Sequence, residues 1–174
     1  MVMSGVAAPG ARASAYGSQV TLPLAVFGPL GVAVDPSGDV FIADQFDYRV
    51  VELSAGSSNQ VTLPFTGLVS PYGFPVGMAV DHAGDVFITV PDDDQVVELP
   101  AGGGSQITLP VTGLNTPTAV AVDEAGDVFV VDSLNNRVVE LPAGSSGQIT
   151  LPFSGLDGPY DLAVDQAGDV FVTD

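Results

Sequence analysis

The sequence predicts an all-β fold built from repeated four-stranded sheets. The pattern AVDxxGDVF occurs four times, and the Asp of its AVD falls at Asp35, Asp81, Asp123 and Asp165. Successive copies are therefore 46, 42 and 42 residues apart. A repeat in the forties that consists of short β-type runs is typical of a propeller blade.

Each repeat contains four candidate strands separated by turn residues. The runs are short, rich in Val and interrupted by Gly, Pro, Ser or Asp, which excludes a helical period. Both faces of these strands are apolar, since Val40 and Ile42 alternate with Phe41 and Ala43. Blades stacked around an axis cover a sheet on both sides in this way. The expected strands are 31–35, 39–44, 49–54 and 60–65 in the first repeat, 77–81, 85–90, 95–100 and 106–111 in the second, and 118–123, 127–132, 137–142 and 148–153 in the third.

The two ends of the chain carry parts of a blade. Residues 19–24 (QVTLPL) match the fourth strand QVTLPF of the first repeat, whereas only a first and a second strand, 161–165 and 169–174, follow the third repeat. We therefore expect a lead-in at 1–15 that is flexible, and a single propeller domain at 16–174. Its repeats lie near 31–65, 77–111, 118–153 and 161–174, which gives three complete blades, an N-terminal outer strand and a C-terminal half-blade.

The open edge of the half-blade leaves three arrangements. A bare strand edge is an aggregation liability, so a partner for this edge is expected. The chain is a fragment of a longer propeller, or it closes on itself as a four-bladed ring, or it self-associates through the open edge. The first arrangement is the preferred interpretation.

The charge balance limits the partners. Three Arg and no Lys stand against 21 acidic residues, so the formal net charge is −18. This field repels nucleic acid and anionic membrane surfaces, so neither is an expected partner. The acidic surface serves solubility, or it attracts cations or a basic partner. The absence of Lys and Cys excludes a phosphate-binding lysine, a Schiff base, a thiol nucleophile and cysteine-based metal sites.

The repeat resembles a known family. AVDxxGDVFVxD, followed by NNRVVEL at 135–141 and QITLPFSGL at 148–156, is similar to NHL-repeat propellers. The likeness is greatest to the extracellular sensor domain of bacterial transmembrane Ser/Thr protein kinases, a six-bladed propeller that also begins with an isolated outer strand. The resemblance covers residues 16–174. It implies a non-enzymatic sensor on the extracytoplasmic side of the cell surface, although a cysteine-free chain also fits a cytoplasmic location.

The chain also departs from this family. Glu52, Glu98 and Glu140 stand where a basic residue is expected in the kinase sensors, and residues 94–95 are Asp-Gln where the other repeats have Tyr-Arg and Asn-Arg. The surface is therefore more acidic, and a shared ligand is not expected. No part of a kinase catalytic domain is present in the sequence.

The candidate binding residues lie in loops that differ between repeats. Propellers bind on the face formed by the loops between strands two and three and between successive blades, where we expect an unidentified protein, peptide or small ligand. The linker 69–76 is four residues longer than its counterpart, and its aromatic residues would serve a contact or fold over their own blade. The predicted contact residues are Phe46, Asp47, Tyr48, Tyr72, Phe74, Asp92, Asp93, Asp94 and Asn135.

The sequence indicates no catalytic centre. The run Asp92–Asp94 lacks the Gly and closing Glu of an EF-hand loop, so a solvated acidic loop is favoured over a calcium site. His82 is the single histidine and occupies a variable turn position. Arg49 and Arg137 are flanked by Asp44 and Asp132, and we expect each Arg to fix its loop through an ion pair or a contact with a carbonyl group. The sequence thus predicts no enzyme, no cofactor and no metal. The alternative is a metal-dependent propeller enzyme such as a streptogramin-type lyase or hydrolase, for which the chain lacks suitable histidines.

Overall fold

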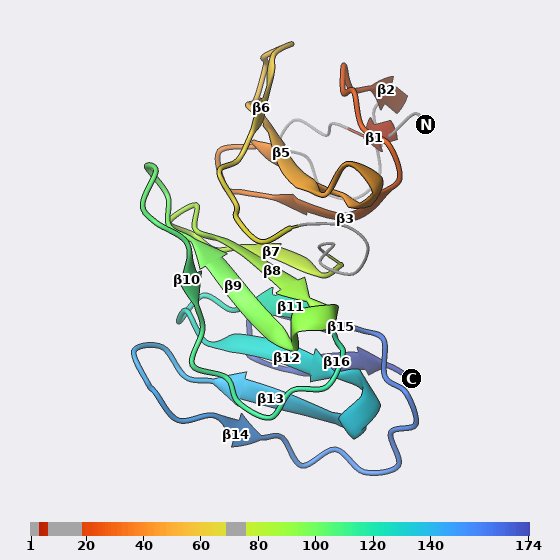
Figure 1. The fold of residues 1–174 in the computed structure, drawn as a ribbon, viewed down its shortest axis with the longest axis vertical. Helices are drawn as coiled ribbons and strands as arrows, with labels where there is room; N and C mark the ends of the chain where they lie inside the picture. Colours follow the sequence, from red (N-terminus) through yellow and green to blue (C-terminus); the bar gives the residue numbers. More distant parts are fainter. Residues whose placement is uncertain (1–3, 7–18, 69–75) are drawn as a thin grey trace.

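The structure is a computed structural model that describes residues 4–6, 19–68 and 76–174. Within these ranges the chain forms three four-stranded antiparallel sheets and two two-stranded sheets, connected by turns and by short 3-10 helices (Figure 1). No helix of the described part is long and apolar enough to cross a membrane. The predicted all-β architecture of three complete blades and a C-terminal half-blade is confirmed.

Each complete blade is a meander in which strands follow one another in sequence order. The first blade comprises β3 (Pro29–Val34), β4 (Val40–Asp44), β5 (Arg49–Leu53) and β6 (Gln60–Thr62). The second comprises β7 (Met78–Val80), β8 (Val86–Val90), β9 (Gln95–Leu99) and β10 (Ile107–Thr108). The third comprises β11 (Pro117–Val122), β12 (Val128–Asp132), β13 (Arg137–Leu141) and β14 (Ile149–Thr150).

The fourth strand of each blade is shorter than the sequence predicts. The expected runs extend to residues 65, 111 and 153, but the strands end at Thr62, Thr108 and Thr150. One further bond continues each ladder, as when the amide of Leu63 donates to the carbonyl of Val50 at 2.9 Å. The next residue in each repeat is a proline, which has no N–H to donate and so ends the pairing.

The terminal pieces form separate two-stranded sheets. The half-blade consists of β15 (Asp161–Val164) and β16 (Val170–Thr173). The N-terminal outer strand β2 (Gln19–Thr21) pairs antiparallel with β1 (Ser4–Val6), a strand that the sequence analysis did not predict and that falls inside the expected lead-in. In the described part of the chain these two sheets do not pair with each other, so the four-bladed closed ring is not formed.

The two aspartates of the repeated AVDxxGD pattern stabilise the turns of each blade. The carboxylate of Asp35 accepts a hydrogen bond from the amide of Asp39 at 2.8 Å, and Asp39 in turn accepts from the amide of Ala55 at 2.6 Å. The first Asp closes the hairpin between strands one and two, and the second fixes the loop between strands three and four. The same bonds recur at Asp81, Asp85, Asp123 and Asp127.

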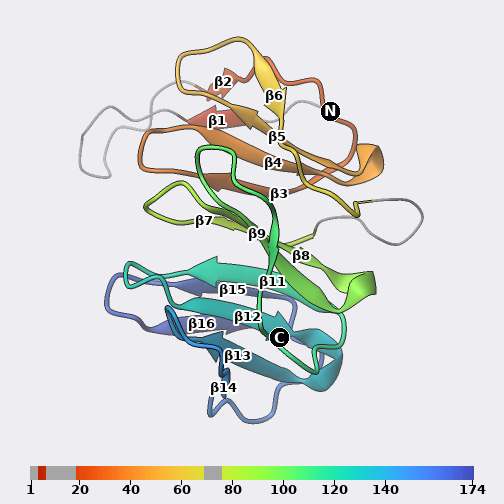
Figure 2. The same cartoon turned by 60° about the vertical axis from the view of Figure 1, so that its left-hand side comes forward.

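The core lies between successive blades. The Phe of GDVF in each complete blade faces the next sheet, and Phe41, Phe87 and Phe129 are only 5%, 5% and 4% exposed. Figure 2 shows the sheets layered one on another. The first strands are innermost and approach closely, because a Cβ on Gly77 would lie 2.6 Å from the Cα of Ala119. All four first strands line one pocket of about 230 Å³, which marks the central axis.

Candidate functional site

One loop of every complete blade carries a 3-10 turn between the second and third strands. These turns are η1 (Gln45–Asp47), η2 (Pro91–Asp93) and η3 (Ser133–Asn135). Each ends in a residue with φ of 52° that is not glycine, namely Tyr48, Asp94 or Asn136. The backbone is thus the same in each turn, while the side chains at its exposed positions differ.

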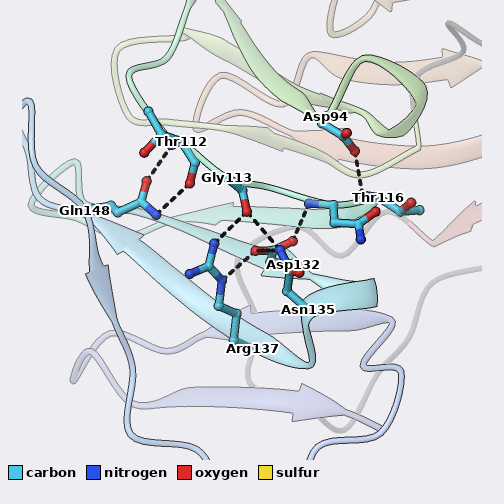
Figure 3. A network of polar contacts seen from close by, with 9 residues as sticks. Asp94, Thr112, Gly113, Thr116, Asp132, Asn135, Arg137 and Gln148 are labelled. Carbon is cyan, nitrogen blue, oxygen red and sulfur yellow. Dashed lines mark hydrogen bonds and ion pairs between the residues drawn. The ribbon is translucent and has the colours of Figure 1, made fainter.

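In the third blade, a buried carboxylate connects this turn to the incoming linker. The Asp132 side chain is fully buried and accepts from the amide of Asn115 at 2.7 Å and from Arg137 Nε at 2.6 Å (Figure 3). The side-chain amide of Asn135 (Nδ2) donates to the same carboxylate at 2.8 Å. Arg137 also donates to the carbonyl of Gly113 at 2.8 Å. The predicted ion pair is confirmed, and its effect is to hold the linker against the loop.

Two further side chains, one from the third blade and one from the second, also bind this linker. The side-chain amide of Gln148 accepts from the Thr112 amide at 2.6 Å and donates to the Thr112 carbonyl at 3.0 Å. From the preceding blade, Asp94 accepts a bond from the Thr116 amide at 2.8 Å (Figure 3). The linker is therefore fixed by side chains at or next to the ends of four strands, β12, β13, β14 and β9.

The first blade repeats this arrangement, which we call the linker clamp: a buried Asp at the end of strand two and an Arg at the start of strand three. Asp44 accepts from the amide of Phe27 at 2.7 Å and from Arg49 Nε at 3.0 Å. Arg49 donates to the carbonyl of Ala25 at 2.8 Å and to Asp47 at 3.1 Å. Asp47, predicted as a contact residue, is therefore partly engaged in holding Arg49.

The second blade has no linker clamp. Its corresponding residues are Val90 and Gln95, and the Gln95 side chain donates to Asp93 at 3.4 Å. This is the blade whose incoming linker is expanded by four residues. Tyr72 and Phe74 belong to residues 69–75, which lie outside the described part of the chain, so their predicted contact stays a prediction.

The clamp of the first blade places an exposed aromatic pair on the loop face. Phe27 and Phe46 are 65% and 55% exposed, and their ring centroids are 5.3 Å apart with a tilt of 53°. Gly28 lies beneath the Phe46 ring, and a Cβ there would overlap it. The sequence analysis selected Phe46 but missed Phe27. The rule that linkers contribute to the loop face, applied to the linker before the first blade, would have found it.

The other predicted residues fall into two groups. Asp92 and Asp93 are exposed on η2 and available to a partner. Tyr48 is half-buried and packs against the hydrophobic cluster between the first and second blades, while Asp94 and Asn135 are exposed but hold neighbouring backbone or side chains. Phe46, Asp92 and Asp93 therefore remain as contact positions among the described candidates, and Asp93 also accepts a hydrogen bond from Gln95 at 3.4 Å.

The opposite face carries acidic grooves between blades. The groove between the second and third blades, about 260 Å³, is lined by Asp81, Asp85 and Glu98 among others. Burial raises the pKa of Glu98 above its ordinary value of 4.5, and Asp85 and Asp81 raise it further. His82 lines a shallow pocket at the axis on this side. Within the described ranges no three His, Cys, Asp or Glu side chains are arranged to hold a metal ion.

Comparison with known proteins identifies the fold. No family model and no curated protein sequence matches the chain. Among solved structures, a virginiamycin B lyase from Staphylococcus aureus with quinupristin superposes with a TM-score of 0.71 at 12% identity, covering 90% of this chain and 53% of the lyase.

Two further solved structures lead to the same result. A streptogramin B lyase gives a TM-score of 0.66 at 15% identity over 91% of this chain and 59% of the other. A chain of a nidogen/laminin complex gives 0.76 at 22% identity over 91% of this chain and 60% of the other. The chain thus spans little more than half the length of these structures. Such identities show the fold alone: the chain has the β-propeller fold.

Proposed function

We propose that this chain is a non-enzymatic binding propeller that takes up a protein or peptide on its loop face. The observation that carries this proposal is the tilted pair of Phe27 and Phe46, which stays exposed although the clamp of Asp44 and Arg49 fixes it in place. Rigid, exposed aromatic rings are the usual anchors of protein interfaces, because they bury much apolar area at a small entropic cost.

The acidic residues of the loop face define the chemistry of the partner. Asp92 and Asp93 project from the loop of the neighbouring blade, and the whole chain carries a formal net charge of −18. An acidic surface accelerates and favours association with basic partners. The ligand that fits best is an extended peptide or protein loop with an apolar side chain flanked by Lys or Arg.

The cellular role that we propose follows the resemblance to NHL-type sensors. In that role the chain is the extracytoplasmic sensor of a receptor Ser/Thr kinase, and ligand contact on the loop face supplies the signal. The lyase alternative finds little support in the side chains, because His82 lies at the axis on the face opposite the variable loops.

A phage-displayed library of random peptides tests the binding proposal. We expect the purified chain to enrich peptides that combine Phe, Leu or Trp with Lys or Arg. Replacing both Phe27 and Phe46 by Ala should weaken binding of a selected peptide by at least about 10-fold, in the range of interface hot spots. Phe153→Ala is the matched control, because Phe153 is an exposed Phe in the segment that follows the outer strand β14. Equal loss in the control, or enrichment of acidic peptides, would contradict the proposal.

A second measurement addresses the alternative directly. The chain is incubated with quinupristin, the compound present in the lyase structure, in the presence of Mg²⁺ or Ca²⁺, and the mixture is followed by chromatography. We expect quinupristin to remain unchanged. Conversion that depends on chain concentration would replace the binding proposal with an enzymatic one.

A further inference from the structure

We propose that the two grooves between complete blades, on the face opposite the variable loops, each accept a Lys or Arg side chain of a basic protein partner. These inter-blade grooves have volumes of about 390 Å³ between the first and second blades and about 260 Å³ between the second and third. Each groove is formed by residues of two adjacent complete blades. They constitute a second binding site, which does not involve Phe27 or Phe46.

The floor of each inter-blade groove is apolar. It consists of a Phe and a Leu from the earlier blade and a Val and a Leu from the later blade. In the second groove all four are at most 8% exposed and belong to the hydrophobic cluster between the blades. These residues are Phe87, Leu109, Val128 and Leu141 in the second groove, and Phe41, Leu63, Val86 and Leu99 in the first. An aliphatic chain that enters a groove therefore meets apolar surface.

A single glutamate from the third strand of the earlier blade stands in the wall of each groove. Glu98, in the second groove, pairs across the sheet with Phe87 on one side and Ile107 on the other, so it lies between apolar neighbours. Burial raises the pKa of Glu98, and Asp85 and Asp81 raise it further. The ionised carboxylate is thus destabilised in the free chain, and a cation in the groove would stabilise it.

The aspartates beside Glu98 already bind backbone amides. Asp81 accepts a hydrogen bond from the amide of Asp85 at 2.9 Å, and Asp85 accepts one from the amide of Ala101 at 2.6 Å. Within residues 4–6, 19–68 and 76–174, by contrast, the Glu98 carboxylate takes part in no ion pair and no hydrogen bond. Glu98 is therefore the carboxylate of this groove that is available to a ligand.

The first groove contains the equivalent glutamate in a different setting. Glu52 accepts a hydrogen bond from the Ser54 hydroxyl at 3.0 Å. In the second blade Pro100 occupies the position of Ser54, and a proline side chain has no donor. Because Glu52 has an internal partner and Glu98 does not, the second groove should make the larger contribution to binding.

The shape and charge of the grooves fit a basic side chain. The stem of a Lys or Arg can cover the apolar floor while its cationic end reaches Glu98. Arg49 and Arg137 cannot serve this purpose, since both are held in linker clamps at the other end of the strands. With a net charge of −18, the chain attracts a basic partner from solution.

The repetition of the groove favours a polypeptide over a small amine. The two grooves are built from equivalent residues of successive repeats, and both open on the same face. One segment with two basic side chains can therefore fill both grooves, and its second contact forms at a high effective concentration. A small amine with a single charge lacks this advantage.

Fluorescence anisotropy with labelled peptides of Gly, Ser and Lys tests the charge requirement at about 0.05 M salt. A peptide with two Lys residues joined by a flexible linker should bind more tightly than one with a single Lys. Glu98→Gln should weaken binding about 5-fold, whereas Asp157→Asn, which removes one charge from an exposed loop outside the grooves, should weaken it less than about 2-fold. Equal losses in the two variants, or equal binding of the two peptides, would overturn the proposal.

A change of shape without a change of charge tests the groove itself. Ala143 is exposed in the wall of the second groove, so Ala143→Met should fill the groove and weaken peptide binding about 5-fold. Ala55→Met is the matched control, because Ala55 occupies the equivalent position of the first blade and lines neither groove. Both variants should keep the far-ultraviolet dichroism of the parent. Unchanged binding by Ala143→Met would show that the peptide responds to overall charge only.

Carbodiimide coupling locates the bound peptide, because the reagent joins a Lys amine to a carboxylate that it contacts. Mass spectrometry of the digested product should find the peptide on Glu98 and Glu52. Coupling mainly at Asp92 and Asp93 would place the basic peptide on the loop face and overturn the groove site. Since the peptide has no apolar side chain, its binding should survive the Phe27→Ala, Phe46→Ala double replacement, which separates this result from the proposed function.

Discussion

Arg137 Nε lies 2.6 Å from the fully buried carboxylate of Asp132, and this pair joins the linker that enters the third blade to the loop between β12 and β13. Both partners also bind linker backbone, through Asn115 and Gly113. The pair therefore stabilises the fold, and its removal should lower the free energy of unfolding.

Replacing Asp132 by Ala should lower the free energy of unfolding by about 2–4 kcal/mol, because the Asn115 amide and Arg137 lose their partner. Asp44→Ala should cost less, since Arg49 retains Asp47 at 3.1 Å. Urea unfolding of the two variants measures the difference. An equal loss would show that Asp47 does not compensate for Asp44.

The second blade allows the clamp to be installed. Val90→Asp alone should destabilise the chain by about 3 kcal/mol, because Val90 is 2% exposed and the new carboxylate would be buried without a partner. Gln95→Arg alone should be nearly neutral. The double variant should recover about 1–2 kcal/mol of the loss as a coupling energy in a double-mutant cycle. A coupling energy of zero would mean that the second blade does not place the two positions as its neighbours do.

Gly77 permits the close approach of the first strands of the second and third blades. A Cβ there would lie 2.6 Å from the Cα of Ala119 and 2.7 Å from the carbonyl oxygen of Thr118, both backbone atoms. Gly77→Ala should therefore lower stability by about 1–3 kcal/mol, as overpacking does. Gly147→Ala is the control, because a Cβ at Gly147 meets only a side-chain oxygen at 3.9 Å. Thermal melting compares the two variants. Similar melting temperatures would contradict the close packing of the first strands at the central axis.

Glu98 gives a prediction about pH. Its pKa is raised above 4.5 first by burial and then by Asp85 and Asp81, so the folded chain binds this proton more tightly than the unfolded chain. The charged form therefore costs stability above the raised pKa, and this cost disappears as the pH falls through it toward 4.5. Glu98→Gln should melt at a higher temperature than the parent at pH 7, and the advantage should shrink as the pH is lowered. An advantage that is independent of pH would point to packing instead of charge.

The periodic features of the fold could be predicted from sequence. The alternation of Phe41 with Ile42 required a sheet covered on both faces, and the structure buries both residues. The pairing of Arg137 with Asp132 could be predicted, because the first and third repeats both have an Asp followed five positions later by an Arg. The extent of the fourth strands was overestimated, because a match to QVTLPF does not show that its Pro ends the hydrogen-bond ladder.

The candidate site was less predictable, since exposure and hydrogen bonding depend on neighbouring blades. Asp94 and Asn135 look like free polar loop residues in the sequence, yet each holds another part of the loop face. Tyr48 looks like an exposed aromatic residue, but it packs against the hydrophobic cluster between the first and second blades. Phe27 is separated from Phe46 by 19 positions, and only the folded linker brings the two rings together.

The bonds of Asp35 and Asp39 both end within their own blade. A duplicated or deleted copy of the repeat would thus bring along, or remove, every side chain that closes its own hairpins, and would leave the turns of the remaining copies unchanged. In the lineage of such a chain, the number of repeats could change by unequal recombination without new compensating substitutions in the turns. Selection would then act on the variable positions of η1, η2 and η3, while the rest of each repeat is inherited as one unit.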